Sequence, residues 1–122
     1  MLYDICERSF EFSKNVVLFI NNGHLNRIYN SILDQLLRSA TSIGANIIEA
    51  RSGNSIKNLI SFYSIALRSA NETHYWLRLL KETVNNNDEN IQLLINESQE
   101  ISKILAKSII TLKKNDQNIK LK

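Results

Sequence analysis

The sequence predicts an all-α protein, an antiparallel four-helix bundle with up-down-up-down topology. Its 122 residues contain no proline and three glycines, fewer turn residues than a β-rich or α/β domain needs. Apolar residues recur at steps of three and four through most of the chain, which is the spacing of an amphipathic helix. Short polar breaks separate these stretches, and such short connections make neighbouring helices antiparallel.

The first two predicted helices cover residues 2–20 and about 25–50, and a polar break separates them. Gly23 lies in that break and suits the left-handed backbone conformation that often terminates a helix. Gly44 lies inside the second helix, where an exposed glycine costs about 1 kcal/mol relative to alanine. We therefore expect Gly44 to permit a close helix crossing or a kink.

The second helix is apolar on more than one side. Its main stripe consists of Leu25, Ile28, Ile32, Leu36, Ala40, Ile43 and Ile47. Leu33, Leu37 and Ile48 widen the apolar surface beyond that stripe. This breadth indicates either a central, well-covered helix or an additional face used for self-association.

Polar residues mark the ends of the remaining helices. Ser55 is a suitable N-cap for the third helix, which we expect to extend to about residue 84. A polar turn over residues 85–88 follows, in which Asp88 or Asn87 is a suitable cap for the fourth helix.

The fourth helix has the most regular apolar spacing of the chain. Its stripe consists of Ile91, Leu94, Ser98, Ile101, Leu105, Ser108 and Leu112, at alternating steps of three and four residues. After this stripe the sequence becomes polar and basic. We therefore expect a four-helix bundle over residues 1–114 and a basic, frayed C-terminal tail over residues 115–122.

Composition and charge exclude several classes of protein. No apolar run approaches the roughly 18 residues that a membrane span needs, and the N-terminus lacks the layout of a signal peptide. The single cysteine, Cys6, excludes an internal disulfide, and its place on an apolar stripe predicts a core position. We therefore expect a cytoplasmic protein without membrane association. The net charge of +3 permits contact with nucleic acid without requiring it.

The sequence has no pattern typical of a metal or cofactor site. A di-iron bundle needs Glu-x-x-His pairs on two helices, and neither His24 nor His74 has a glutamate three residues before it. Zinc needs clustered Cys and His ligands, and there is no glycine-rich phosphate loop. We therefore expect no metal and no cofactor.

Two stretches resemble the motifs of the 23S ribosomal RNA intervening-sequence proteins, a bacterial family of four-helix bundles. Residues 35–50 read Gln-Leu-Leu-Arg-Ser-Ala-Thr-Ser-Ile-Gly-Ala-Asn-Ile-Ile-Glu-Ala, where the family typically shows Gln-Leu-x-Arg-Ala and then Ser-Ile-x-x-Asn-Ile-x-Glu-Gly. Residues 66–72 match its Ala-Leu-x-Ser-x-x-Glu run. The likeness extends over nearly the whole chain, although Gly44, Ala50 and Arg68 replace the proline, the glycine and the small residue that are usual at these positions.

The resemblance implies a bundle that assembles into a homo-oligomeric ring, often a pentamer, without enzymatic activity. A related protein is the accessory variability determinant of diversity-generating retroelements. Its likeness suggests a basic surface that engages RNA and a reverse transcriptase. Besides further copies of the chain, this likeness suggests nucleic acid, RNA or DNA, or an enzyme that acts on it, as a partner.

Polar residues of the matched motifs form the first candidate site, and they are Arg38, Asn46, Glu49 and Glu72. Arg38 and Glu49 are eleven residues apart, about three helical turns, so they share one side of the second helix without touching. The four residues form either a ligand or partner site, or a polar network between helices or subunits that fixes their register. Because no nucleophile lies nearby, we favour the network.

The second candidate site is the basic side of the fourth helix. Its residues are Lys103, Lys107, Lys113 and Lys114, and Lys120 and Lys122 continue it toward the end of the chain. These lysines form either a solvated surface near a helix C-terminus or a contact to phosphates, which would make RNA or DNA binding sensitive to salt.

Arg68 and His74 provide an alternative with catalytic chemistry, because Arg-x5-His on the third helix resembles the motif of HEPN ribonucleases. His74 would act as general acid or base toward a ribose hydroxyl, and Arg68 would stabilise the charge on the phosphorane. No asparagine follows Arg68 directly, and we favour an exposed or interface histidine. The sequence thus predicts a non-enzymatic oligomeric bundle that binds nucleic acid or a nucleic-acid enzyme, with a purely structural interaction bundle as the alternative.

Overall fold

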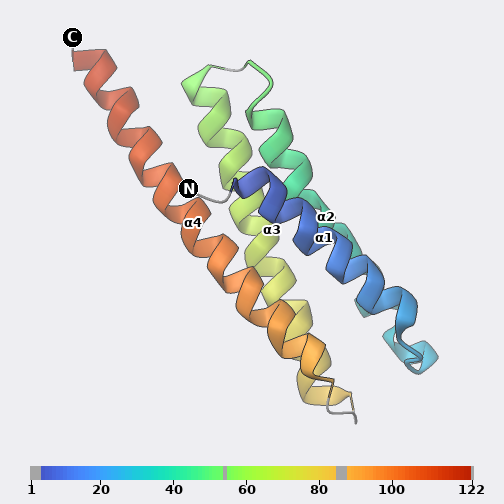
Figure 1. Ribbon diagram of the computed structural model, residues 1–122. Coiled ribbons are helices and arrows are strands. Elements are labelled where there is room, and N and C mark those ends of the chain that lie inside the picture. The colour runs from blue at the N-terminus through green and yellow to red at the C-terminus, as the bar shows by residue number, and fades with distance from the viewer. Residues whose placement is uncertain (1–3, 54, 85–87, 122) are drawn as a thin grey trace.

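The computed structural model describes residues 4–53, 55–84 and 88–121, with side chains through residue 118. Its elements are α1 (Ile5–Asn22), a short 3-10 helix η1 (Arg27–Tyr29), α2 (Asn30–Ala50), α3 (Ile56–Thr83) and α4 (Glu89–Leu121). The four α-helices pack as an antiparallel up-down-up-down bundle (Figure 1). Since α1 and α3 each pack against both α2 and α4, they take diagonal positions in it. The predicted fold class is confirmed.

The apolar core runs along the bundle, and all four helices contribute to it. The largest fully buried apolar side chains are Phe12, Val16, Leu36, Ile43, Ile47, Leu77, Leu80, Ile101 and Leu105. Burial of such a side chain stabilises the fold by about 1.5–3 kcal/mol relative to exposure. The stripe predicted for α4 is confirmed, because its first five members are buried and its last two, Ser108 and Leu112, are half-buried.

Ser55 and Asp88 cap α3 and α4, as predicted. Oγ of Ser55 accepts a hydrogen bond from the backbone N–H of Asn58 at 3.2 Å. Oδ1 of Asp88 accepts one from the backbone N–H of Asn90 at 2.9 Å. Each cap satisfies a donor that the first turn of a helix otherwise leaves without a partner. The alternative cap for α4, Asn87, lies outside the described residues.

The connection between α1 and α2 differs from the prediction in two respects. Gly23 is extended, with φ −83° and ψ 147°, and is not left-handed. A side chain is disfavoured there for another reason, since a Cβ would lie 3.2 Å from the carbonyl oxygen of Phe19. In addition, α2 begins at Asn30 and not near Leu25, because η1 precedes it. Ile28 in η1 is 77% exposed and leaves the predicted stripe, since a 3-10 turn has three residues and not 3.6.

The last helix is longer than predicted. It continues through residues 113–121, where the sequence predicts the start of a tail. These residues include no glycine or proline, so no local signal ends the helix there. The division of the chain at residue 114, and fraying of this end in solution, stay predictions.

The first two helices cross closely at Gly44, as predicted. A Cβ on Gly44 would lie 3.5 Å from Cβ of Ser9 on α1, which is an ordinary contact distance. One turn away, Oγ of Ser13 donates a hydrogen bond to the carbonyl oxygen of Ala40 at 3.2 Å. Small residues on both helices therefore allow the two backbones to approach each other.

Candidate functional site

Small polar residues, most of them with a hydroxyl, join α2 to α3. We call this set the α2–α3 seam, and it consists of Ser39, Ser42, Asn46, Ser69 and Thr73. The hydroxyls of Ser39 and Thr73 are hydrogen-bonded at 2.9 Å, and Oγ of Ser69 donates to Oγ of Ser42 at 3.0 Å. Nδ2 of Asn46 also donates to Oγ of Ser42, at 3.0 Å. Buried polar groups require such partners. The seam therefore fixes the register between the two helices, and each of its hydroxyls has a hydrogen-bond partner.

The structure does not bring the four residues of the first candidate site together. Asn46 is half-buried within the seam, whereas Arg38 and Glu49 are exposed on α2. Glu72 is exposed on α3 and accepts a hydrogen bond from Nε1 of Trp76 at 3.3 Å. A network between helices would thus run through Asn46 and the hydroxyls, which are not among the site residues predicted from the sequence. Their signal was present, because serine and threonine recur at three- and four-residue steps on both helices.

An ion pair between Arg8 and Glu97 connects α1 to α4. Nε of Arg8 lies 2.7 Å from Oε2 of Glu97, and Nη2 lies 2.8 Å from Oε1. This two-pronged geometry is the strongest that arginine and a carboxylate form, and both side chains are about two-thirds buried, with 28% and 31% of their surfaces exposed. The sequence gives no signal for this pair, because its members are 89 positions apart.

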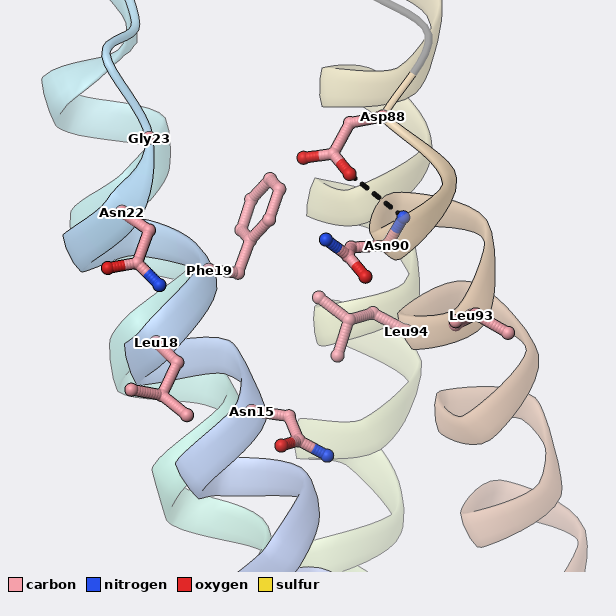
Figure 2. Close-up of a pocket in the computed structure, with 9 residues that line it drawn as sticks. All are labelled: Asn15, Leu18, Phe19, Asn22, Gly23, Asp88, Asn90, Leu93 and Leu94. Carbon is pink, nitrogen blue, oxygen red and sulfur yellow. Dashed lines mark hydrogen bonds between the residues drawn. The ribbon is translucent and has the colours of Figure 1, made fainter.

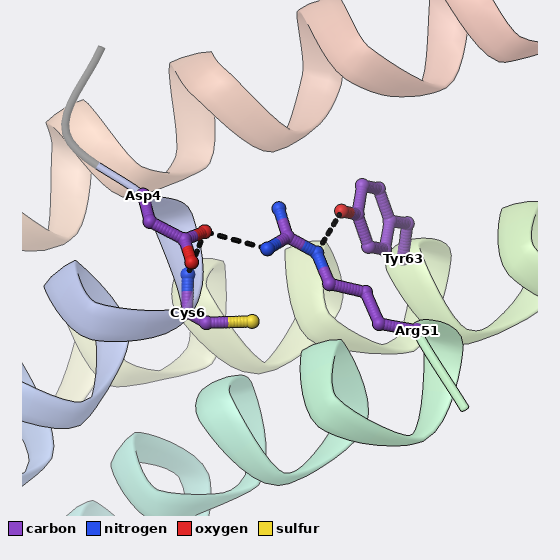
Figure 3. A network of polar contacts seen from close by, with 4 residues as sticks. All are labelled: Asp4, Cys6, Arg51 and Tyr63. Carbon is purple, nitrogen blue, oxygen red and sulfur yellow. Dashed lines mark hydrogen bonds and ion pairs between the residues drawn. The ribbon is translucent and has the colours of Figure 1, made fainter. Parts of the chain in front are cut away.

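Arg51 connects the start of α1 to α3 at one end of the bundle (Figure 3). Its Nη1 donates to Oδ1 of Asp4 at 2.6 Å, and its Nε donates to the hydroxyl of Tyr63 at 3.4 Å. The same Oδ1 caps α1 by accepting the backbone N–H of Cys6 at 3.1 Å. Arg51 thus holds the N-terminal cap of α1 against α3.

The protonation states in this cluster follow from its contacts. The backbone N–H of Cys6, and then the Arg51 guanidinium, hold the pKa of Asp4 below its ordinary value. Burial by itself would lower the pKa of Arg51, but its bonds to Tyr63 and Asp4 outweigh that effect and raise it. Burial raises the pKa of the Cys6 thiol. Cys6 therefore stays a neutral thiol at the edge of the core, which is not the state of a nucleophile.

Exposed apolar residues gather on one surface of α1 and α2. We call this surface the α1–α2 outer face, and it comprises Phe10, Val17, Leu37 and Ile48, which are 60%, 44%, 37% and 59% exposed. The backbone of Phe10 on α1 lies beside Gly44 on α2, and Ile48 follows Gly44 by one helical turn. Residues from both helices therefore contribute to one face. The sequence allows two roles for the second helix, a well-covered central helix or a helix with an additional apolar face. In the structure Ile43 is buried in the core, whereas Leu37 and Ile48 are exposed on an additional face.

A second exposed apolar surface lies on α3. Tyr75, 59% exposed, and half-buried Trp76 contact each other edge to face with ring centroids 5.0 Å apart. We call this pair the α3 outer face. Because α3 is diagonal to α1, it lies on a different side of the bundle from the α1–α2 outer face.

Three of the predicted basic residues share one side of α4. Lys103, Lys107 and Lys114 are exposed, and their spacings of four and seven residues keep them on one side of a helix. Lys113 points to a different side, because it precedes Lys114 by one residue, or about 100°. Lys103 pairs with Glu100 at 3.6 Å. The Lys120 and Lys122 side chains lie outside the described residues.

Arg68 and His74 do not converge within one chain. Arg68 is exposed, whereas His74 is half-buried. Their separation of six residues turns the helix by 600°, so the two side chains leave it about 120° apart. The geometry does not favour their joint action on one phosphate.

Neither a membrane segment nor a metal site emerges from the part of the chain that the structure describes. None of its helices combines the length and the apolar content needed to cross a bilayer. No group of three or more His, Cys, Asp or Glu side chains within it is placed to hold a metal ion.

Comparison with known proteins shows similarity to a protein family and to solved structures. The family described as 23S rRNA-intervening sequence protein matches residues 2–107. The crystal structure of a protein of unknown function from the S23 ribosomal protein family of Bacteroides thetaiotaomicron has a TM-score of 0.76 and 37% sequence identity, and the alignment covers 87% of this chain and 98% of that chain. No curated protein matches the chain.

Proposed function

Since the chain belongs to the family of 23S rRNA-intervening sequence proteins, we propose that it is a non-enzymatic assembly module that associates with copies of itself. The observation that carries this proposal is the pair of exposed apolar surfaces, the α1–α2 outer face and the α3 outer face. Grouped apolar residues on a surface indicate an interaction site. The free cysteine suits a reducing compartment, so we place the protein in the cytoplasm.

The position of the two faces favours a head-to-tail contact. A two-fold dimer uses one surface on both subunits, whereas two different surfaces on one subunit favour contact between unlike faces of successive copies. When the rotation between copies closes, such contacts form a ring. A ring of this chain, a pentamer by family resemblance, would bury the α1–α2 outer face of each copy against the α3 outer face of the next.

Light scattering tests this assembly. The wild type is expected at a multiple of its 14.0 kDa chain mass. Ile48→Asp places a charge in the α1–α2 outer face and should give the monomer. Ile110→Asp is the matched control, because Ile110 on α4 is 56% exposed against 59% for Ile48, and it should keep the wild-type mass. A wild type that is monomeric at every concentration would contradict the proposal.

Nucleic acid is the second candidate function, and the lysines on α4 favour it. Lys103, Lys107 and Lys114 form a basic stripe, and a ring would repeat it once per copy. Lysines that neutralise phosphates give affinity that falls steeply with salt. The partner of this stripe would be RNA, DNA or the charged surface of a nucleic-acid enzyme such as a reverse transcriptase.

Filter binding separates this candidate from a purely structural bundle. The wild type should retain RNA or DNA at low salt and lose it at high salt, and replacing the three lysines with glutamine should abolish retention. Lys57→Gln on α3 provides a control of the same chemistry away from the stripe. If the filter retains no RNA or DNA at low salt, the purely structural bundle is the function that remains.

A HEPN-like ribonuclease would cleave RNA, and His74→Ala would abolish that cleavage. The different directions in which Arg68 and His74 leave the helix do not favour this alternative.

A further inference from the structure

A cavity of about 510 Å³ lies between the second half of α1 and the beginning of α4 (Figure 2). The Arg8–Glu97 pair joins these helices, and the cavity separates them farther along α1. Its lining residues are Asn15, Leu18, Phe19, Asn22, Gly23, Asp88, Asn90, Leu93 and Leu94. A volume in this range accommodates a small organic ligand.

The side chains that point into the cavity offer one aromatic ring and several hydrogen-bonding groups. Figure 2 shows the Phe19 ring, the Asp88 carboxylate and the Asn90 amide all directed into the space between the helices. The Asn15 amide approaches it from the α1 side. One oxygen of Asp88 already accepts the backbone N–H of Asn90, which leaves the other oxygen as an acceptor.

These groups suit a planar ring with N–H donors and ring-nitrogen acceptors. An aromatic side chain stacks on such a ring, and an asparagine amide pairs with its edge through two hydrogen bonds. Among the described residues that line the cavity, Asp88 is the single ionisable one, so a phosphate or a carboxylate is disfavoured there. A carbonyl oxygen placed against the Asp88 carboxylate is disfavoured for the same reason.

We propose that this cavity binds an adenine ring. Adenine presents an amino group beside a ring nitrogen, as an asparagine amide requires, and it has no carbonyl oxygen to face Asp88. The ring stacks on Phe19, the amino group donates to the free oxygen of Asp88, and the sugar lies toward solvent. The cavity lies within one chain, so this site is independent of the proposed assembly.

Calorimetric titration of the full chain with adenosine and inosine tests the proposal. Inosine carries a carbonyl oxygen in place of the adenine amino group, so it should bind at least tenfold more weakly than adenosine. Phe19→Leu keeps the apolar volume but removes the ring, and it should weaken adenosine binding at least tenfold. Phe62→Leu, on α3 and outside the cavity lining, is the matched control and should bind as the wild type does.

Asp88→Asn provides a second variant that keeps the fold, because asparagine also caps a helix. It should narrow the preference for adenosine over inosine. No measurable binding of adenosine, equal binding of inosine, or wild-type binding by Phe19→Leu would each overturn the proposal. Light scattering of Phe19→Leu should give the wild-type mass, which separates this result from the outcome for assembly.

Adenine could reach the cavity as a free nucleoside or as an unpaired base of RNA, and short oligoadenylate distinguishes these sources. If oligoadenylate binds more tightly than adenosine while oligouridylate does not, the base is presented by RNA. If adenosine binds and oligoadenylate does not, the ligand is the free nucleoside. Both results support the adenine site, because adenosine binds in each case, and failure of adenosine to bind overturns it.

Discussion

The α2–α3 seam and the α1–α4 side of the bundle are held together differently. In the seam, small hydroxyls are buried or half-buried, hydrogen-bonded and close together, so the helices have little freedom to shift. Between α1 and α4, the Arg8–Glu97 pair joins the helices on one side of a cavity. The difference indicates a rigid half, α2 with α3, and a more open half in which α1 leaves room for a ligand.

The largest expected effect comes from overfilling the seam. Ser69→Leu adds a bulky side chain at a buried position between α2 and α3, and overpacking of this kind costs about 1–3 kcal/mol. Asn15→Phe also enlarges a side chain, but at the cavity wall, where the space is open, and should change stability by less than about 0.5 kcal/mol. Urea unfolding monitored by circular dichroism measures both. Equal losses would show that the two sides do not differ in packing.

Removal of the Arg8–Glu97 pair should have the next largest effect. Arg8→Met leaves the Glu97 carboxylate partly buried without its two-pronged partner and should cost about 1–2 kcal/mol. A double-mutant cycle with Glu97→Gln isolates the pair from other contacts of Arg8. A coupling energy near zero would mean that this pair does not hold α1 to α4.

A smaller effect, of opposite sign, is expected at the crossing of α1 and α2. Gly44→Ala introduces a Cβ at an ordinary contact distance of 3.5 Å from Ser9, and alanine is favoured over glycine in a helix by up to about 1 kcal/mol. The midpoint of urea unfolding should therefore rise. Ser9→Ala should be neutral or stabilising, because its buried hydroxyl has no hydrogen-bond partner among the described residues. A loss of stability in Gly44→Ala would indicate a tighter crossing than the structure shows.

The smallest effect concerns Asp4, at the end of α1. Its pKa is lower in the folded chain than in the unfolded chain, so its contribution to stability is present above the unfolded value and is lost as the pH falls below about 4. Asp4→Asn should therefore melt at a lower temperature than the wild type at pH 7, with the gap closing in acid. If the difference in melting temperature does not depend on pH, the ionised Asp4 carboxylate does not contribute to stability.

Local patterns in the sequence predicted the helices well. The features that could not be predicted depend on tertiary contacts. The stripe of α4 and the Ser55 cap depend on neighbouring residues alone, so they could be recognised before any fold was known. Gly23 was misjudged because the closeness of the Phe19 carbonyl, and not its own dihedral angles, disfavours a side chain. The Arg8–Glu97 pair and the cavity each involve two helices that are far apart in the sequence. The spacing of residues along one helix does not indicate which other helix packs against it.

The candidate sites follow the same division. Lys103, Lys107 and Lys114 were found from spacing and share one side of α4, whereas Lys113 was grouped with them although the helix turns it away. Arg38, Asn46, Glu49 and Glu72 were selected by motif, and the structure places only Asn46 in the seam. Their role between subunits stays a prediction, because it depends on contacts between copies.

Cross-linking between the two outer faces gives a direct measurement of head-to-tail assembly. In a Cys6→Ser background, Ile48→Cys marks the α1–α2 outer face and Tyr75→Cys marks the α3 outer face. Under mild oxidation, the chain that carries both cysteines should form a ladder of covalent multimers, while each single-cysteine chain should remain uncross-linked. A covalent dimer from either single-cysteine chain, or no ladder from the double variant, would contradict the account.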